Sequence, residues 1–168
     1  MEIKLKQIAT IKSPFCDLQN MPVQPRGAKD TYATIEFKKE FAEGLKDLDG
    51  FSHVYLIYYF HKIETPKLSV VPFNDKTNTP RGVFATRTPM HPNSIGLSVV
   101  ELVSVKDNIV TIKGIDILDG TPLLDIKPYI ENFDQVCGEV RSGWMKSSSD
   151  EVSSMRSDER FIKEKSDF

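Results

Sequence analysis

The chain has 168 residues, of which 39% are apolar and 27% charged, and these proportions suit one domain with a hydrophobic core. Lys and Arg together number 22 against 24 Asp and Glu, and the net charge of −2 excludes a polycation that binds nucleic acid through its bulk charge. An acidic disordered chain is excluded as well. Any anionic partner must therefore be bound by a local basic patch.

Hydropathy and cysteine content indicate the compartment. The sequence contains no run of about 18 apolar residues, so no membrane-spanning helix is expected. Cys16 and Cys137 lie far apart in the sequence and form no CxxC pair. This pattern argues against a disulfide framework or a cysteine-based zinc site and favours a reducing, cytoplasmic location.

The first part of the chain predicts three strands, one loop and one helix. Alternating apolar and polar residues predict strands over 2–12 and 31–37, and the nearly continuous apolar run at 51–61 predicts a buried strand. Prolines and Gly27 predict a long loop over 13–30. Apolar residues at helical spacing predict a short helix over 39–48.

The second part is mainly β. Its predicted elements are a loop over 64–80, a strand over 82–86, a proline loop over 88–95, strands over 96–106 and 108–118, a turn over 119–122 and a strand over 123–127. Asp107-Asn108 is a hairpin signal. About seven short strands without βα alternation predict a mainly β fold, a small antiparallel barrel with short helices. We expect this domain over residues 1–145, followed by a polar tail over 146–168 that is a frayed helix or disordered.

Two possible chemical motifs are weak. The stretch DILDGTP at 116–122 does not fit the nucleophile motif of haloacid-dehalogenase-type phosphatases, because two residues separate Asp116 from Asp119 and that chemistry requires one. We interpret it as a hairpin turn with an Asp-Gly tip. His53 and His61 would lie ~26 Å apart on a straight strand, so they cannot ligate one metal ion and no metal site is expected.

The densest group of chemically useful residues is RGVFATRTPMHPNSIG, residues 81–96. It places Arg81, Arg87 and His91 among prolines that order the backbone. Arginine guanidinium groups suit carboxylate or phosphate ligands. The alternative is a rigid surface loop whose arginines are simply solvated.

A second candidate is LDIKPY, residues 124–129. Asp125 and Lys127 are two residues apart and share one face of the predicted strand. They form either a surface ion pair of little energetic value or a binding site for a zwitterionic ligand.

Three stretches of the sequence resemble the TsaA-like family. They are FSHVYLIYYFH at 51–61, RGVFATRTPMHPNSIGLSVVEL at 81–102 and DILDGTPLLDIKPY at 116–129, and the resemblance covers roughly residues 3–145. It implies a small β-barrel methyltransferase that uses S-adenosylmethionine and forms a homodimer, with cofactor pockets near the subunit interface. The implied substrate is tRNA, methylated on N6 of threonylcarbamoyladenosine beside the anticodon.

The resemblance also implies the site residues. The cofactor-binding residues are Pro25, Arg26, Gly27, Ile63, Glu64, His91, Glu101, Leu124, Asp125, Ile126 and Lys127. The expected substrate-binding residues are Arg81, Arg87 and Asn93. The acceptor is a ureido N–H that must lose its proton, and a nearby base would assist this loss. The candidate bases are His61, Glu64, Glu101 and Asp125, and the sequence does not choose among them.

Two residues depart from the family pattern. His91 stands where family members often have Arg, and Ser94 replaces a proline of the family's RPNPIG motif. A histidine is shorter than an arginine, and its charge depends on pH. An S-adenosylmethionine-binding module, or a methyltransferase with a different acceptor, is therefore the alternative function.

Overall fold

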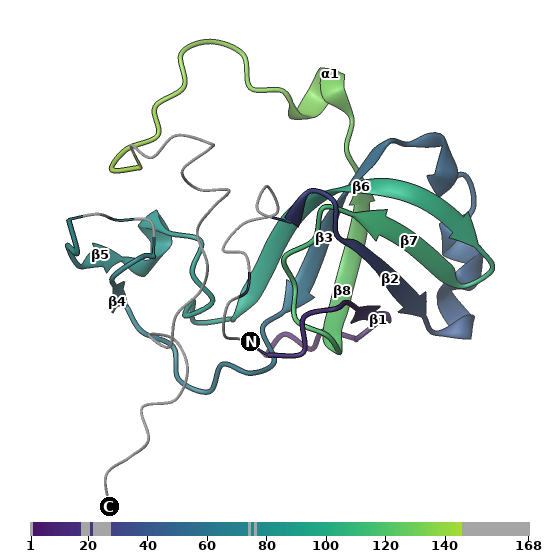
Figure 1. The fold of residues 1–168 in the computed structure, drawn as a ribbon, viewed down its shortest axis with the longest axis horizontal. Coiled ribbons are helices and arrows are strands. Elements are labelled where there is room, and N and C mark those ends of the chain that lie inside the picture. Colours follow the sequence, from purple (N-terminus) through teal and green to yellow (C-terminus); the bar gives the residue numbers. More distant parts are fainter. Residues whose placement is uncertain (1, 18–20, 22–27, 74, 76, 146–168) are drawn as a thin grey trace, which may run out of the picture.

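In the part of the chain that the structure describes, six antiparallel strands close into a barrel (Figure 1). The computed structural model describes residues 2–17, 21, 28–73, 75 and 77–145. The barrel strands are β1 (Ala9–Lys12), β2 (Tyr32–Phe37), β3 (His53–Tyr59), β6 (Ile95–Lys106), β7 (Ile109–Lys113) and β8 (Thr121–Pro128). Their order is β1-β2-β7-β6-β3-β8, with β8 pairing back onto β1. The mainly β, antiparallel barrel expected from the sequence is confirmed.

The core lies inside the barrel and follows the alternation of each strand. In β2, Ala33, Ile35 and Phe37 are buried, and the residues between them are exposed. Every second side chain of a strand points to the same face, so one parity fills the barrel and the other faces outward. All six strands contribute to a single hydrophobic cluster.

Strands β6 and β7 form the hairpin predicted at Asp107-Asn108. Asp107 has a φ of 53°, the left-handed conformation that a tight hairpin turn requires. The Asn108 side-chain amide donates a hydrogen bond of 2.7 Å to the carbonyl of Phe37. The turn is thereby tied to the neighbouring strand β2.

The strand predicted over 2–12 is shorter than expected. It begins at Ala9, and the preceding Ile3 and Leu5 are exposed. Apolar alternation here does not mark a strand, because these side chains have no core to enter.

The helix predicted over 39–48 is wrong in type. This region forms two 3₁₀ helices, η2 (Lys39–Leu45) and η3 (Leu48–Gly50). Gly44 lowers the helix propensity, and no side chain caps the start of η2. The apolar spacing still has its expected effect, because Leu45 and Leu48 are buried in the barrel core.

A small lobe lies beside the barrel (Figure 1). Its elements are β4 (Ser69–Val70), β5 (Arg81–Gly82) and the 3₁₀ helix η4 (Val83–Ala85). The loop predicted over 64–80 therefore contains a strand, and η4 replaces most of the strand predicted over 82–86. The lobe's own small core consists of Val70, Val83 and Met90, with Ile63 packed against it.

The turn predicted over 119–122 is present but is not a hairpin tip. Gly120 has a φ of 76°, yet β8 pairs with β1 and β3 instead of β7. Residues 114–118 belong to the connection between β7 and β8, which runs past β2 and β1. At its start the Gly114 N–H donates to the carbonyl of Thr31, just before β2, and at its end the Gly120 N–H donates to that of Ile11 in β1. We call residues 114–118 the crossing segment.

The chain leaves the barrel through α1 (Glu131–Asp134). No helix among the described residues is long and apolar enough to cross a membrane. No group of three or more His, Cys, Asp or Glu in this part of the chain could hold a metal ion. Cys16 and Cys137 are both free, exposed thiols. The tail predicted over 146–168 lies outside the described residues, and the domain boundary at 145 stays a prediction.

Candidate functional site

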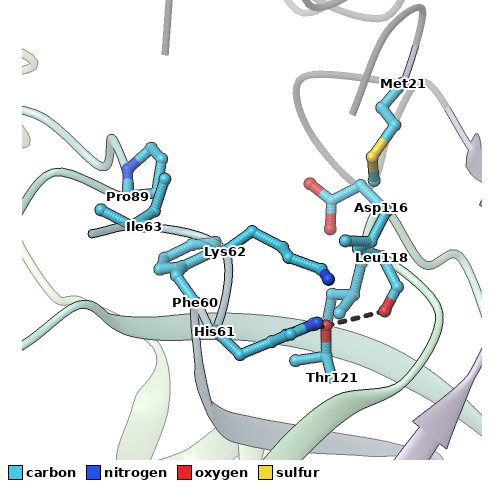
Figure 2. Close-up of a pocket in the computed structure, with 10 residues that line it drawn as sticks. Met21, Phe60, His61, Lys62, Ile63, Pro89, Asp116, Leu118 and Thr121 are labelled. Atoms are coloured by element: carbon cyan, nitrogen blue, oxygen red, sulfur yellow. Dashed lines mark hydrogen bonds between the residues drawn. The ribbon is translucent and has the colours of Figure 1, made fainter. Parts of the chain in front are cut away.

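A cavity of about 100 Å³ lies where β3 leaves the barrel (Figure 2). Its walls come mainly from the turn after β3, the loop before β6 and the crossing segment. The lining residues are Met21, Phe60, His61, Lys62, Ile63, Pro89, Asp116, Ile117, Leu118 and Thr121. Most of these side chains are apolar, and a concave, mainly apolar surface with a few polar groups is the usual form of a small-molecule site.

His61 is a half-buried member of the cavity wall. Its Nδ1 lies 3.5 Å from the hydroxyl of Thr121, and that hydroxyl donates to the carbonyl of Leu118 at 2.7 Å. Since the hydroxyl proton is already used, Thr121 can only accept from His61. Burial lowers the pKa of His61, and the charge of Lys62 lowers it further. His61 is therefore neutral at neutral pH and a weakened base.

Asp116 is the acid of the cavity, and the sequence analysis did not select it as a site residue. Its neighbours Ile115 and Ile117 are buried in the barrel core. Figure 2 shows the Asp116 carboxyl directed away from the crossing segment, with Met21 on one side and Lys62 on the other. The sequence signal was an Asp inside the apolar run IDIL, which the turn interpretation of this stretch hid.

The Asp116 carboxyl is poorly solvated. Its Oδ1 is inaccessible to water and has no hydrogen-bond partner among the described residues. Burial raises the pKa of Asp116 to about 7, because the charged form loses more solvation than the neutral form. At neutral pH this carboxyl therefore exchanges readily between its protonated and ionised forms.

Tyr58 lies close enough to Asp116 to sense its charge. Burial raises the pKa of Tyr58, and the Asp116 charge raises it further, so the phenol stays neutral. The Tyr58 hydroxyl lies 3.2 Å from that of Ser98. Its ring lies against Gly96, where an added Cβ atom would overlap a ring carbon. A glycine at this position therefore leaves the space that the Tyr58 ring fills.

The predicted proline loop places His91 beside the cavity. Pro89 lines the cavity, whereas His91 is not among the lining residues. The His91 Nε2 lies 3.1 Å from the carbonyl of Thr86, so this nitrogen carries the proton. The His91 ring also meets the Phe84 ring edge-on, with centroids 5.8 Å apart.

Ser94 fixes the end of this loop in a conformation that proline cannot adopt. Its φ is 48°, and its N–H donates to the carbonyl of His91 at 2.9 Å. Its own carbonyl accepts a hydrogen bond of 2.8 Å from the N–H of Phe60 at the cavity. Proline has no N–H and holds φ near about −65°. The departure from the family's RPNPIG motif is therefore part of this loop's conformation.

Asp125, Lys127 and Glu101 lie on the outer face of the barrel. Asp125 pairs with Ile57, and Lys127 pairs with Tyr55 on the neighbouring β3. The Lys127 Nζ lies 2.8 Å from the Asp125 carboxylate, so the expected shared face is confirmed and the two side chains form a surface ion pair. Glu101 of β6 pairs with His53, at the end of β3 opposite to His61. At ~3.3 Å per residue, the length of β3 separates Glu101 from the cavity.

The other residues expected from the family resemblance are dispersed. Ile63 lines the cavity and Glu64 is exposed beside it, while Ile126 packs against the barrel core. Leu124 is half-buried, next to the register shift in the pairing of β3 with β8. Pro25, Arg26 and Gly27 lie outside the described residues.

The expected substrate-binding residues lie in the lobe and in the loop that follows it. Arg81 donates to Asp75 at 2.7 Å, and its guanidinium carbon lies 5.4 Å from the ring centroid of Trp144. Arg87 and Asn93 are exposed. Arg81 is therefore part of the lobe's own structure, whereas Arg87 and Asn93 face solvent.

A single chain thus brings together only part of the expected site. His61, Ile63 and the His91 loop surround or flank one cavity, and Asp116 and Thr121 join them. The charged groups at 101, 125 and 127 lie along the outer barrel face.

Comparison with known proteins identifies the family. Residues 10–135 match the tRNA-methyltransferase O N-terminal domain. The chain belongs to this family. The TsaA-like resemblance of the sequence is thereby confirmed. The chain is 48% identical over 157 residues to a protein of Pyrococcus abyssi named as a probable S-adenosyl-L-methionine-binding protein, covering 94% of this chain and 84% of that protein.

A mammalian relative and a solved structure give the same family. A tRNA (adenine(37)-N6)-methyltransferase of Mus musculus is 35% identical over 140 residues, which cover 76% of this chain and 31% of the mouse protein. The crystal structure of TrmO from Pseudomonas aeruginosa superposes with a TM-score of 0.70 at 36% identity. That match covers 85% of this chain and 61% of the solved chain, so the present chain spans about three fifths of its solved relative.

Proposed function

We propose that this protein binds S-adenosylmethionine and transfers its methyl group to N6 of an adenosine in tRNA, with threonylcarbamoyladenosine beside the anticodon as the acceptor. One observation carries the proposal. The three sequence stretches that resemble the family lie far apart in the chain, yet His61, Pro89 and Asp116, one from each stretch, line the same cavity. Relatives of the chain are named as S-adenosylmethionine-binding proteins and as tRNA methyltransferases.

The cavity suits the cofactor in its chemistry. Apolar walls from Ile63, Pro89 and Leu118 complement a flat adenine ring and a methyl group. Lys62 at the same cavity offers a cation for a carboxylate. When bound, S-adenosylmethionine supplies an electrophilic methyl group on a sulfonium. The protein's part is to exclude water and to hold the acceptor nitrogen in line with that methyl group.

We further propose that the protein is a homodimer joined through the outer face of β3 and β6. This face exposes an apolar stripe: Tyr59 at 40%, Ile95 at 41%, Leu97 at 58% and Val99 at 39%. Contiguous exposed apolar surface is typical of a protein interface. A two-fold partner seated here would carry its own Glu101, Asp125 and Lys127, which border the stripe in the strand register. The residues that one protomer keeps apart would then meet across the interface.

The dimer is tested by light scattering coupled to size-exclusion chromatography. Leu97→Asp places a charge in the stripe and should convert the dimer to a monomer. Ile3→Asp, at a residue that is 71% exposed and precedes the barrel, is the control and should stay dimeric. A Leu97→Asp protein that elutes and scatters as the wild type does would exclude this face as the interface.

The RNA would meet the loop that carries Phe84, Arg87 and Asn93. Phe84 is 76% exposed beside His91, and Arg87 and Asn93 are exposed on the same segment. Proteins recognise single-stranded RNA loops by stacking bases on aromatic and arginine side chains. A tRNA acceptor and two free, exposed thiols both fit a reducing cytoplasm.

The central experiment follows the labelled methyl group. Purified protein is incubated with methyl-labelled S-adenosylmethionine and with tRNA that either carries or lacks the threonylcarbamoyl group, and the digested nucleosides are separated. We expect label on N6 of threonylcarbamoyladenosine only. Label in another nucleoside would preserve the methyltransferase and reject the acceptor, whereas no label in any nucleoside would reject RNA methylation.

A second function follows if no label is transferred. The Pyrococcus relative, at 48% identity, is named for S-adenosylmethionine binding alone. A binding module of this kind would give calorimetric heat with the cofactor and no labelled nucleoside. A methyltransferase with a different acceptor would instead label a component of fractionated cell extract.

A further inference from the structure

The carboxyl group of Asp116 lines the cavity. Its surroundings differ from those of Asp75, Glu101 and Asp125. Asp125 is paired with Lys127, and Asp75 is paired with Arg81. Glu101 is exposed and lies at the far end of β3. Asp116, in contrast, lines the cavity and has one buried oxygen with no hydrogen-bond partner in the described part of the chain. Such a group is expensive to keep in an apolar wall unless a ligand uses it.

The charged and titratable groups around Asp116 leave its carboxyl available. His61 and Lys62, which follow β3, line the same cavity. Tyr58 belongs to β3, and the charge of Asp116 raises its pKa. Directly after the crossing segment, the Asp119 carboxylate accepts a hydrogen bond of 3.0 Å from the backbone N–H of Ser13. The Lys62 ammonium has no lone pair with which to accept a proton. The Tyr58 phenol stays neutral. His61 is the only other candidate base among the described residues that line the cavity, and burial weakens it.

Methyl transfer to a ureido nitrogen needs a base of matched strength. A general base works best when its pKa lies near the working pH, because it is then both largely ionised and basic enough to take the proton. Burial raises the pKa of Asp116 to about 7, whereas it lowers that of His61. Of the two cavity residues, the acid has the better-matched strength.

We propose that Asp116 is the general base that removes the N6 proton of the acceptor adenosine during methyl transfer. This inference rests on the proposed function. The nitrogen lone pair attacks the methyl carbon, a C–N bond forms, and the C–S bond breaks with its electron pair left on sulfur. The N6 proton passes to the Asp116 carboxylate, which is then neutral and later releases the proton to water. The products are N6-methylated nucleoside and neutral S-adenosylhomocysteine, so charge and atoms balance.

The test compares Asp116→Asn with wild type in the label-transfer assay. Asn keeps the size of the side chain but cannot take a proton, so we expect kcat to fall by roughly 10²- to 10⁴-fold. Asp116→Glu retains a carboxyl and should recover part of that loss. Asp49→Asn, at an exposed position in η3, is the matched control and should keep the wild-type rate.

The pH profile separates a base from a structural residue. Wild-type kcat/KM should rise with pH to a plateau, with an apparent pKa near the value of about 7 that burial gives Asp116. This acid limb should vanish in Asp116→Asn, while calorimetry with S-adenosylmethionine still shows binding. A variant with the wild-type rate, or one that keeps the acid limb, would overturn the inference and leave the proposed function standing. Loss of cofactor binding in the variant would make Asp116 a binding residue instead. A wild-type protein that labels no nucleoside would overturn the proposed function, and the base role with it.

Discussion

Replacing Asp116 with Asn should stabilise the folded protein at alkaline pH far more than at acid pH. The pKa of Asp116 is about 7 in the folded protein, against an ordinary value of 3.8. Because the folded pKa is the higher one, the folded state retains a proton that the unfolded chain releases between these two values. The contribution of Asp116 to stability therefore falls as pH rises through this window, and it is constant above pH 7.

The size of this effect follows from the shift. About three pKa units at 1.36 kcal/mol each correspond to roughly 4 kcal/mol of destabilisation above pH 8, and to less than about 1 kcal/mol at pH 4. Asp116 is only half-buried as a whole residue, and an Asn amide in its place still lacks a partner for one oxygen. Both facts reduce the gain, so we expect Asp116→Asn to stabilise the protein by roughly 1–3 kcal/mol at pH 8.

The measurement is urea unfolding followed by circular dichroism, for both proteins at pH 4.5 and pH 8. Protein concentration is held constant, because dimer formation would contribute to the apparent free energy of unfolding. Comparing variants at each pH removes the effects of all other titrating groups. If the difference between the two proteins were the same at both pH values, or larger at pH 4.5, the carboxyl would not be buried as described.

Three further substitutions test two features of the local structure and the proposed RNA surface. Gly96→Ala should destabilise the barrel by about 1–3 kcal/mol through overlap with the Tyr58 ring; Gly82→Ala, where nothing lies within 4 Å, should have little effect on urea unfolding, and equal effects would contradict the close contact. Ser94→Pro should lower the free energy of unfolding by about 3 kcal/mol, because proline cannot adopt the positive φ and has no N–H to donate to His91. Ser94→Gly keeps the N–H and allows the positive φ, so it should unfold at nearly the wild-type urea concentration. An equal loss of stability in both variants would argue against this loop conformation. Phe84→Ala should weaken tRNA binding by about 1–3 kcal/mol without changing S-adenosylmethionine binding in calorimetry, and unchanged tRNA affinity would remove Phe84 from the RNA surface.

The sequence was sufficient for the features that depend on local pattern. Alternation in residues 31–37 predicts a barrel strand because every second side chain there enters one core. The hairpin at Asp107-Asn108 needs only a turn residue that tolerates a positive φ between two β segments. The shared face of Asp125 and Lys127 follows from the two-residue period of any strand.

The features that depend on contacts between distant segments could not be predicted in this way. A turn motif at 119–122 does not reveal that β8 pairs with β1 and β3, because that choice depends on how the whole barrel closes. The family resemblance named Glu101 and His91 together, but it carries no distances. Only the register of β3 with β6 shows that Glu101 lies beside the end of β3 that is far from the cavity.

Asp116 shows how a conflict between stability and local preference can indicate function. An ionised carboxyl in an apolar wall, with one oxygen that lacks a partner among the described residues, lowers stability at neutral pH, and an Asn of the same shape would not carry that charge. If Asp116 served only the structure, its replacement would lower the stability of the protein, and any loss of catalytic rate would result from unfolding. A general base should do the opposite: Asp116→Asn would gain stability at pH 8 while losing its rate. A variant whose free energy of unfolding rises while its catalytic rate falls cannot be misfolded, because a misfolded protein does not become harder to unfold.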